Sequence, residues 1–184
     1  MLDYVAGRME AKEPLAAYLA RAVKESASPR LHDEPFFMKS DDLRRRPGAK
    51  PLAVLFETPY CSGCDELHRE GFRRPELQGL LARFDLARFS LGSRTSVTTP
   101  SGARLPAGEW ARQLKVTYTP SIVFFSPEGV EVLRVESYLR PFHLSGSFEY
   151  VASGAYRKEP SFQRFLRAKA ARLRGEGKTV ELWK

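Results

Sequence analysis

The chain has 184 residues, of which 42% are hydrophobic, enough for one domain with an appendage. No apolar stretch approaches the roughly 18 residues that span a membrane, and the first residues do not resemble a signal peptide. The formal net charge is +8, but the arginines are scattered rather than gathered on one basic face, so we expect an acidic protein partner and no nucleic acid.

The N-terminal segment has a second copy near the C-terminal end. Residues 4–6 and 12–14 match residues 150–152 and 158–160 at a constant offset, and both copies continue into an amphipathic helix. An offset of about one small domain is typical of duplicated units, although two short helical patterns can also match by chance. We therefore expect three parts. Residues 1–30 would be a helical extension, the tail of a preceding homologous domain; residues 31–174 would be the working domain, and residues 175–184 a tail.

The elements between the two copies alternate as in an α/β domain. We expect, in chain order, a linker at 28–35, an edge strand at 36–38, a short helix at 41–44, a strand at 52–57, a helix to about 72, a helix at 76–83, a strand at 84–91, a loop or small excursion at 92–108, a helix at 109–114, strands at 121–126 and 130–135, and a helix at 142–152. Strand, helix and strand imply a parallel pair, and two strands joined by a Pro/Gly turn imply an antiparallel hairpin. The result is a mixed central sheet flanked by helices.

Cys61 and Cys64, the two cysteines of the chain, lie between the strand at 52–57 and the following helix. A C-x-x-C at such a junction indicates a redox dithiol, because unpaired amides at a helix start stabilise a thiolate. We expect Cys61 to attack a disulfide and Cys64 to resolve the mixed disulfide. Asp65 and Glu66 oppose a second anion, which predicts a reductant of ordinary strength.

Two other roles of these cysteines compete with the redox dithiol. A static disulfide is disfavoured because so small a loop gains little entropy on closure. A metal site is the stronger alternative, since His68 follows Cys64 by four residues and lies on the same helix face. Structural zinc is bound by four ligands, whereas copper(I) could be bound by the two thiolates alone. A c-type haem is excluded, because Asp65 and not a histidine follows Cys64.

The order of these elements, with the dithiol after the first main strand and Thr119–Pro120 before the hairpin, resembles the thioredoxin superfamily. The stretches 55–57, 67–70, 119–125 and 150–156 are most similar to SoxW-type exported thioredoxins, and the resemblance spans about residues 39–174. It implies a thioredoxin-like fold, a redox-active Cys61–Cys64 disulfide, no further cofactor or metal, and a cis-proline at Pro120.

The sequence departs from ordinary thioredoxin around the dithiol. Ser62-Gly63 separates the cysteines, Tyr60 replaces the preceding tryptophan, and Tyr118 occupies a usual glycine position. Leu55 stands where thioredoxin buries an acid that assists proton transfer. That role is vacant or falls to Glu57 or to water.

The Thr119–Pro120 dipeptide is the candidate substrate-binding element. As a plain turn it has no function, but a cis bond there would present the backbone of Thr119 to an incoming peptide strand beside Cys61. Tyr60 joins it as a substrate-binding candidate. Tyr60, Tyr118 and Trp110 either rim the partner surface or pack in the core.

The sequence therefore predicts an enzyme, a protein-disulfide reductase with a protein disulfide as substrate and an upstream dithiol as electron donor. The alternative is a copper or zinc carrier, or a non-catalytic adaptor of the same fold. We expect a monomer without a membrane span, periplasmic or otherwise extracytoplasmic by resemblance, with the cytoplasm as the alternative.

Overall fold

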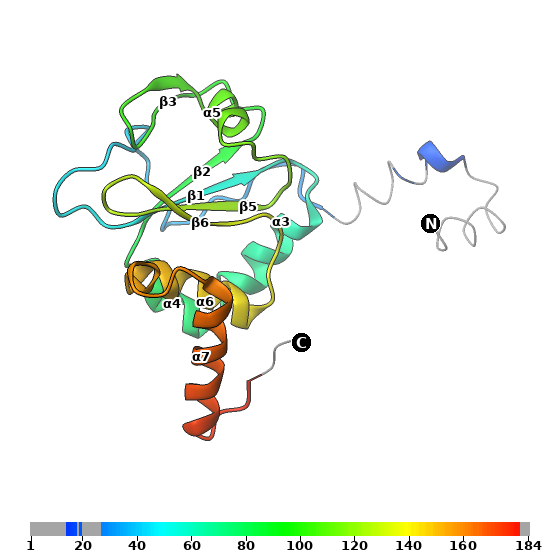
Figure 1. The fold of residues 1–184 in the computed structure, drawn as a ribbon. Coiled ribbons are helices and arrows are strands. Elements are labelled where there is room, and N and C mark those ends of the chain that lie inside the picture. The colour runs from blue at the N-terminus through cyan, green and yellow to red at the C-terminus, as the bar shows by residue number, and fades with distance from the viewer. Residues whose placement is uncertain (1–13, 18, 20–26, 181–184) are drawn as a thin grey trace.

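The computed structural model describes residues 14–17, 19 and 27–180. Residues 15–17 are helical, but most of the first repeat copy lies outside the described residues. Within the described part, no helix combines the length and the apolar character needed to cross a membrane. The fold is a mixed four-stranded sheet with helices on its faces (Figure 1), as predicted.

The central sheet has the strand order β2-β1-β5-β6. Its strands are β1 (Leu52–Glu57), β2 (Asp85–Ser90), β5 (Ser121–Phe125) and β6 (Glu131–Val135). β1 pairs parallel with β2 and antiparallel with β5, and β5 pairs antiparallel with β6. The predicted parallel pair and the predicted hairpin are both confirmed.

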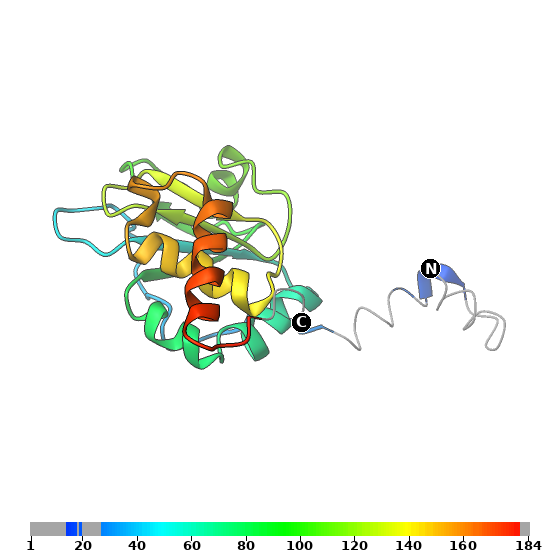
Figure 2. The same ribbon diagram turned by 60° about the horizontal axis from the view of Figure 1, so that its bottom comes forward.

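The helices form two layers around this sheet. They are α3 (Ser62–Glu66), the π-type η1 (Leu67–Gly71), α4 (Pro75–Leu81), α5 (Ala107–Gln113), α6 (Pro141–Ala152), the 3₁₀-type η2 (Ala155–Arg157) and α7 (Phe162–Gly175). α5 lies on one side of the sheet with a small sheet of β3 (Ser96–Thr98) and β4 (Arg104–Pro106), whereas α4 and α6 lie on the other (Figure 1). α7 packs on α6 as an outer layer (Figure 2).

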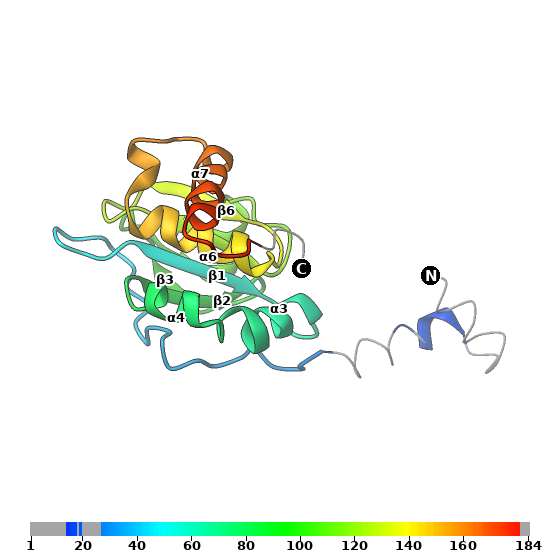
Figure 3. The ribbon, with the colours of Figure 1, turned by 90° about the horizontal axis from the view of Figure 1, so that it is seen from below.

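The side chains of β1 are buried on both faces of the sheet, because β1 is a central strand covered by helices on either side. Val54 and Phe56 belong to the core that contains Trp110 of α5. Leu55 belongs to the opposite core, with Phe148 of α6. Seen from below, α4 and α6 lie over this second face, and α3 lies at the end of β1 (Figure 3).

Three local predictions differ from the structure. The expected edge strand at 36–38 is a single bridge between Phe37 and Leu86. The expected helix at 41–44 is absent, because the Leu43 amide donates to the Thr98 carbonyl (2.8 Å), so pairing with a distant segment satisfies this backbone. The expected loop at 92–108 contains the β3–β4 hairpin.

Two helical glycines give a test of packing in this fold. A methyl group at Gly108 of α5 would lie 2.6 Å from the backbone oxygen of Leu91, whereas one at Gly79 of α4 would have nothing within 4 Å. We expect Gly108→Ala to lower the free energy of unfolding by about 1–3 kcal/mol. Gly79→Ala should raise it by about 0.5–1 kcal/mol, because alanine loses less backbone entropy in a helix. Urea unfolding measures both, and a Gly108→Ala protein as stable as wild type would contradict the packing.

Candidate active site

The two cysteines form a disulfide at the start of α3. Their sulfurs are 2.09 Å apart and their Cα atoms 5.2 Å apart. Cys64 is 3% exposed, whereas Cys61 is partly exposed to solvent. An incoming group can therefore reach Cys61 and not Cys64, which is the asymmetry that attacking and resolving thiols need.

Cys61 is the N-cap of α3, so its sulfur lies at the amides of the first helical turn. The amide of Cys64 donates to Cys61 Sγ at 3.1 Å. Amides in the first turn of a helix favour negative charge placed beside them, and this one is shared with the Cys61 carbonyl (3.0 Å). The same hydrogen bond is available to a Cys61 thiolate once the disulfide is reduced.

The Thr119–Pro120 bond is cis and lies against the dithiol. A methyl group at Gly63, between the cysteines, would be 3.2 Å from Pro120 Cδ. The hydroxyl oxygens of Thr58 and Thr119 are 3.1 Å apart, which links the end of β1 to the proline loop. The structure thus brings Cys61–Cys64 and Thr119–Pro120 together from positions far apart in the sequence.

Two of the three aromatic residues considered for a partner surface are exposed. Tyr60 is 45% exposed and Tyr118 is 66% exposed. Tyr60 also has a backbone φ of +58°, in the left-handed region that residues other than glycine rarely adopt. The partner-surface reading of Trp110 is wrong: this residue is buried and stacks on Phe125, with ring centroids 5.8 Å apart.

Residues 27–37, called the strap below, hold both ends of the dithiol motif. The Ser28 carbonyl accepts from the amide of Tyr60 (2.7 Å), and the Ser28 amide donates to Asp65 Oδ2 (2.8 Å). His32 Nε2 lies 2.6 Å from Asp65 Oδ1. Burial alone would raise the pKa of Asp65, but the hydrogen bonds from His32 and Ser28 outweigh burial and lower it. The lowered pKa keeps Asp65 ionised, so its charge still opposes a thiolate, as predicted, while the strap holds the carboxylate in place.

A buried cluster of Glu57, His68 and Glu34 joins the end of β1, η1 and the strap. His68 Nε2 is 2.9 Å from Glu57 Oε1, and His68 Nδ1 is 3.2 Å from Glu34 Oε1. Arg73 Nη2 donates to both oxygens of Glu34 at 3.0 Å. Glu57 Oε2 is buried and has no hydrogen-bond partner among the described residues. The ring of His32 stacks on that of His68, with centroids 4.5 Å apart.

This cluster changes the interpretation of His68. Both of its ring nitrogens face carboxylates, so they are not directed at the sulfurs as the metal hypothesis with Cys64 requires. Within residues 27–180, no three His, Cys, Asp or Glu side chains are grouped so that they could hold a metal ion. The sequence indicated Glu57, an acid ending an apolar run, but contained no signal for its connection to Glu34.

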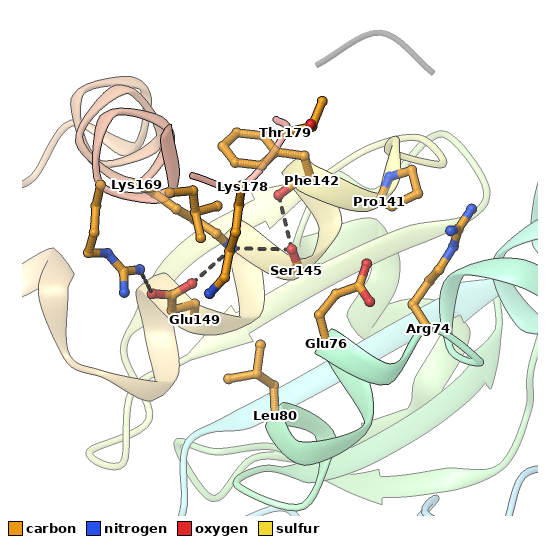
Figure 4. Close-up of a pocket in the computed structure, with 12 residues that line it drawn as sticks. Arg74, Glu76, Leu80, Pro141, Phe142, Ser145, Glu149, Lys169, Lys178 and Thr179 are labelled. Atoms are coloured by element: carbon orange, nitrogen blue, oxygen red, sulfur yellow. Dashed lines mark hydrogen bonds and ion pairs between the residues drawn. The ribbon is translucent and has the colours of Figure 1, made fainter. Parts of the chain in front are cut away.

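A cavity of about 630 Å³ lies between α4, α6 and α7, and no dithiol-site residue lines it (Figure 4). The ammonium group of Lys169 inside it is bound to Glu149 (2.8 Å) and Ser145 (3.2 Å). Arg172 binds the same Glu149 carboxylate at 2.9 Å. Because these charges are paired with each other, the cavity gives no argument for a ligand.

Comparison with known proteins places this geometry in a family. The family model described as a thioredoxin-like domain matches residues 43–152. No curated protein matches the sequence. Among solved structures, a thioredoxin-fold protein from Helicobacter pylori is similar with a TM-score of 0.63 at 16% identity, over 72% of this chain and 88% of that chain. A thioredoxin from Thermus thermophilus is 25% identical with a TM-score of 0.47, over 60% of this chain and 80% of that chain.

A third solved structure, the periplasmic thioredoxin SoxS from Paracoccus pantotrophus, is 18% identical with a TM-score of 0.39, over 58% of this chain and 99% of that chain. The Helicobacter structure shows the same fold, as the sequence resemblance implied. The family model covers more than half of the chain, including both cysteines and the cis-proline. The chain belongs to the thioredoxin-like domain family.

Proposed function

We propose that this protein is a thiol–disulfide oxidoreductase that reduces disulfides of a protein partner. One observation carries the proposal: Cys61 is partly exposed and its sulfur accepts a helical amide, while its disulfide partner Cys64 is buried one turn into the helix. The Cα atoms of the bonded pair are 5.2 Å apart, within the usual range for disulfides.

The reaction transfers two electrons from the reduced dithiol to the client. The Cys61 thiolate attacks one client sulfur, which forms a mixed disulfide and releases the other client sulfur as a thiolate. Cys64 then loses its proton and attacks Cys61 Sγ. The Cys61–Cys64 disulfide forms, the second client thiolate leaves, and the two client thiolates take up protons. An upstream dithiol donor reduces the protein again.

Glu57 is the proposed proton acceptor for Cys64. Leu55, at the position where thioredoxin has its buried acid, is apolar and belongs to the core. Glu57 is two residues further along β1, so its side chain lies on the same face of the sheet as Leu55. Cys64 of α3 and His68 of η1 are both buried and lie one helical turn apart, and His68 binds Glu57.

The client site in this proposal consists of Tyr60, Thr119 and Pro120. An extended client segment would pair with the backbone beside the cis-proline, which places its disulfide at Cys61. The exposed rings of Tyr60 and Tyr118 offer apolar anchors of the kind that protein interfaces use. We further propose that the protein is a monomer and acts in an extracytoplasmic compartment. The chain would consist of an N-terminal extension (residues 1–30), the working domain (residues 31–174) and a C-terminal tail (residues 175–184).

Replacement of the attacking thiol tests the enzyme directly. We expect Cys61→Ser to lower the rate of insulin-disulfide reduction with dithiothreitol to the uncatalysed background, because no other thiol is exposed at the helix start. Turnover is followed as the precipitation of insulin chains. If wild type shows no turnover but binds copper or zinc tightly at one ion per chain, the protein is a carrier.

Replacement of the resolving thiol should trap the client. With Cys64→Ser, the mixed disulfide on Cys61 cannot be resolved, so we expect covalent adducts from native extracts on non-reducing gels that disappear on reduction. The double variant Cys61→Ser/Cys64→Ser is the matched control and should trap nothing. Equal recovery from both variants, or no adduct with Cys64→Ser, would contradict a protein client.

A further inference from the structure

The hydrogen bonds of His68 fix the number of protons in the buried cluster. A neutral imidazole has one donor nitrogen and one acceptor nitrogen, and an ionised carboxylate only accepts. With two ionised carboxylates on a neutral ring, one of the contacts at 2.9 Å and 3.2 Å would join two acceptors. The cluster therefore holds one further proton, either on the second ring nitrogen of His68 or on Glu57 or Glu34.

This proton can move through the cluster, because imidazole accepts a proton on one nitrogen and releases one from the other. The inner end is Glu57, whose Oε2 is buried without a partner among the described residues. The outer end is Glu34, which binds Arg73, a side chain that is 60% exposed. Glu34 also lines a cavity of about 610 Å³ with strap neighbours and Arg88, which gives solvent a route to this end.

We propose that Glu57, His68 and Glu34 form a proton relay between the buried Cys64 thiol and the surface, with the strap residue Glu34 as its outer end. The relay rests on the proposed dithiol exchange. It explains how a proton can leave Cys64, which is 3% exposed, and how it can return there. The strap lies outside the family-matched residues 43–152, so Glu34 is a part of the centre that the matched domain does not supply. Glu34 acts through His68 and is a positioning residue.

The charged groups around His68 come from every segment packed on it. β1 supplies Glu57, the strap supplies Glu34 and His32, and Arg73 follows η1. Asp65 of α3 acts on this group through its 2.6 Å contact with His32. Loss of the Glu34 charge leaves Glu57 as the one carboxylate bonded to the ring, so the proton is held at the inner end and its transfer to solvent slows.

The test uses a small aromatic disulfide, dithiobis(nitrobenzoate) (Ellman's reagent), which releases a coloured nitrothiobenzoate when it is reduced. Reduced protein mixed with an excess of it should release this thiolate in two phases. In the first, the Cys61 thiolate displaces one nitrothiolate and forms a mixed disulfide. In the second, Cys64 loses its proton, attacks Cys61 Sγ and displaces the other nitrothiolate. The reagent accepts the two electrons, and the proton goes to the relay.

Glu34→Gln should leave the first phase unchanged and slow the second about tenfold, less than the roughly 10²–10⁴-fold of a group that transfers the proton directly, because Glu34 acts through His68. It should also alter the pH profile of the second phase between about pH 6 and 9, a change that a merely structural role would not produce. The matched control is Asp33→Asn, which removes the neighbouring carboxylate of the same strap, 91% exposed and 3.8 Å from Arg88. Both of its phases should match wild type.

Three results would overturn the relay: a second phase of Glu34→Gln equal to wild type, equal slowing in Asp33→Asn, or slowing of both phases together. Wild type alone provides a measurement that needs no variant. In deuterium oxide its second phase should slow more than its first, and equal isotope effects on the two phases would also overturn the relay. Release of fewer than two thiolates by wild type would refute the dithiol function, which is a different outcome.

Discussion

The buried imidazole of His68 is the contact on which the active-site architecture depends. It binds Glu57 at the end of β1 and Glu34 in the strap, and it belongs itself to the helix that carries the dithiol. Burial of charged groups is costly unless each one is paired, so removing one partner leaves the others uncompensated. The cluster therefore links the end of β1, the helix that carries the dithiol and the strap, and it helps to hold the helix that presents Cys61.

The strap makes the redox centre larger than the domain that the family defines. Its Ser28 holds Tyr60 and Asp65, the residues on either side of the two cysteines, and its His32 lies within hydrogen-bond distance of Asp65. The Cys61 environment thus combines an attractive helical amide with a nearby acid that the strap keeps ionised. The charge beside the dithiol is thus held by a segment that precedes the first strand of the sheet.

Sequence patterns predicted the features that local chemistry determines. An apolar run, the C-x-x-C junction and a Pro/Gly turn were enough for β1, the dithiol and the β5–β6 hairpin, and Thr119–Pro120 indicated the neighbouring loop. The connections of Glu34 and of residues 41–44 were not predictable, because their partners are distant in sequence and no periodicity marks them. Trp110 was ambiguous because a short helix alone does not reveal which of its faces meets the sheet.

The bridge between Phe37 and Leu86 has a consequence for self-association. With the amide of Met38 donating to the Leu86 carbonyl, it covers part of the β2 edge, which would otherwise expose unpaired backbone groups to another chain. The opposite edge, β6, carries the ion-paired charges of Glu131 and Arg134, which disfavour strand pairing between copies. Loss of the strap would thus leave backbone groups of the β2 edge unpaired and favour aggregation by strand pairing between chains.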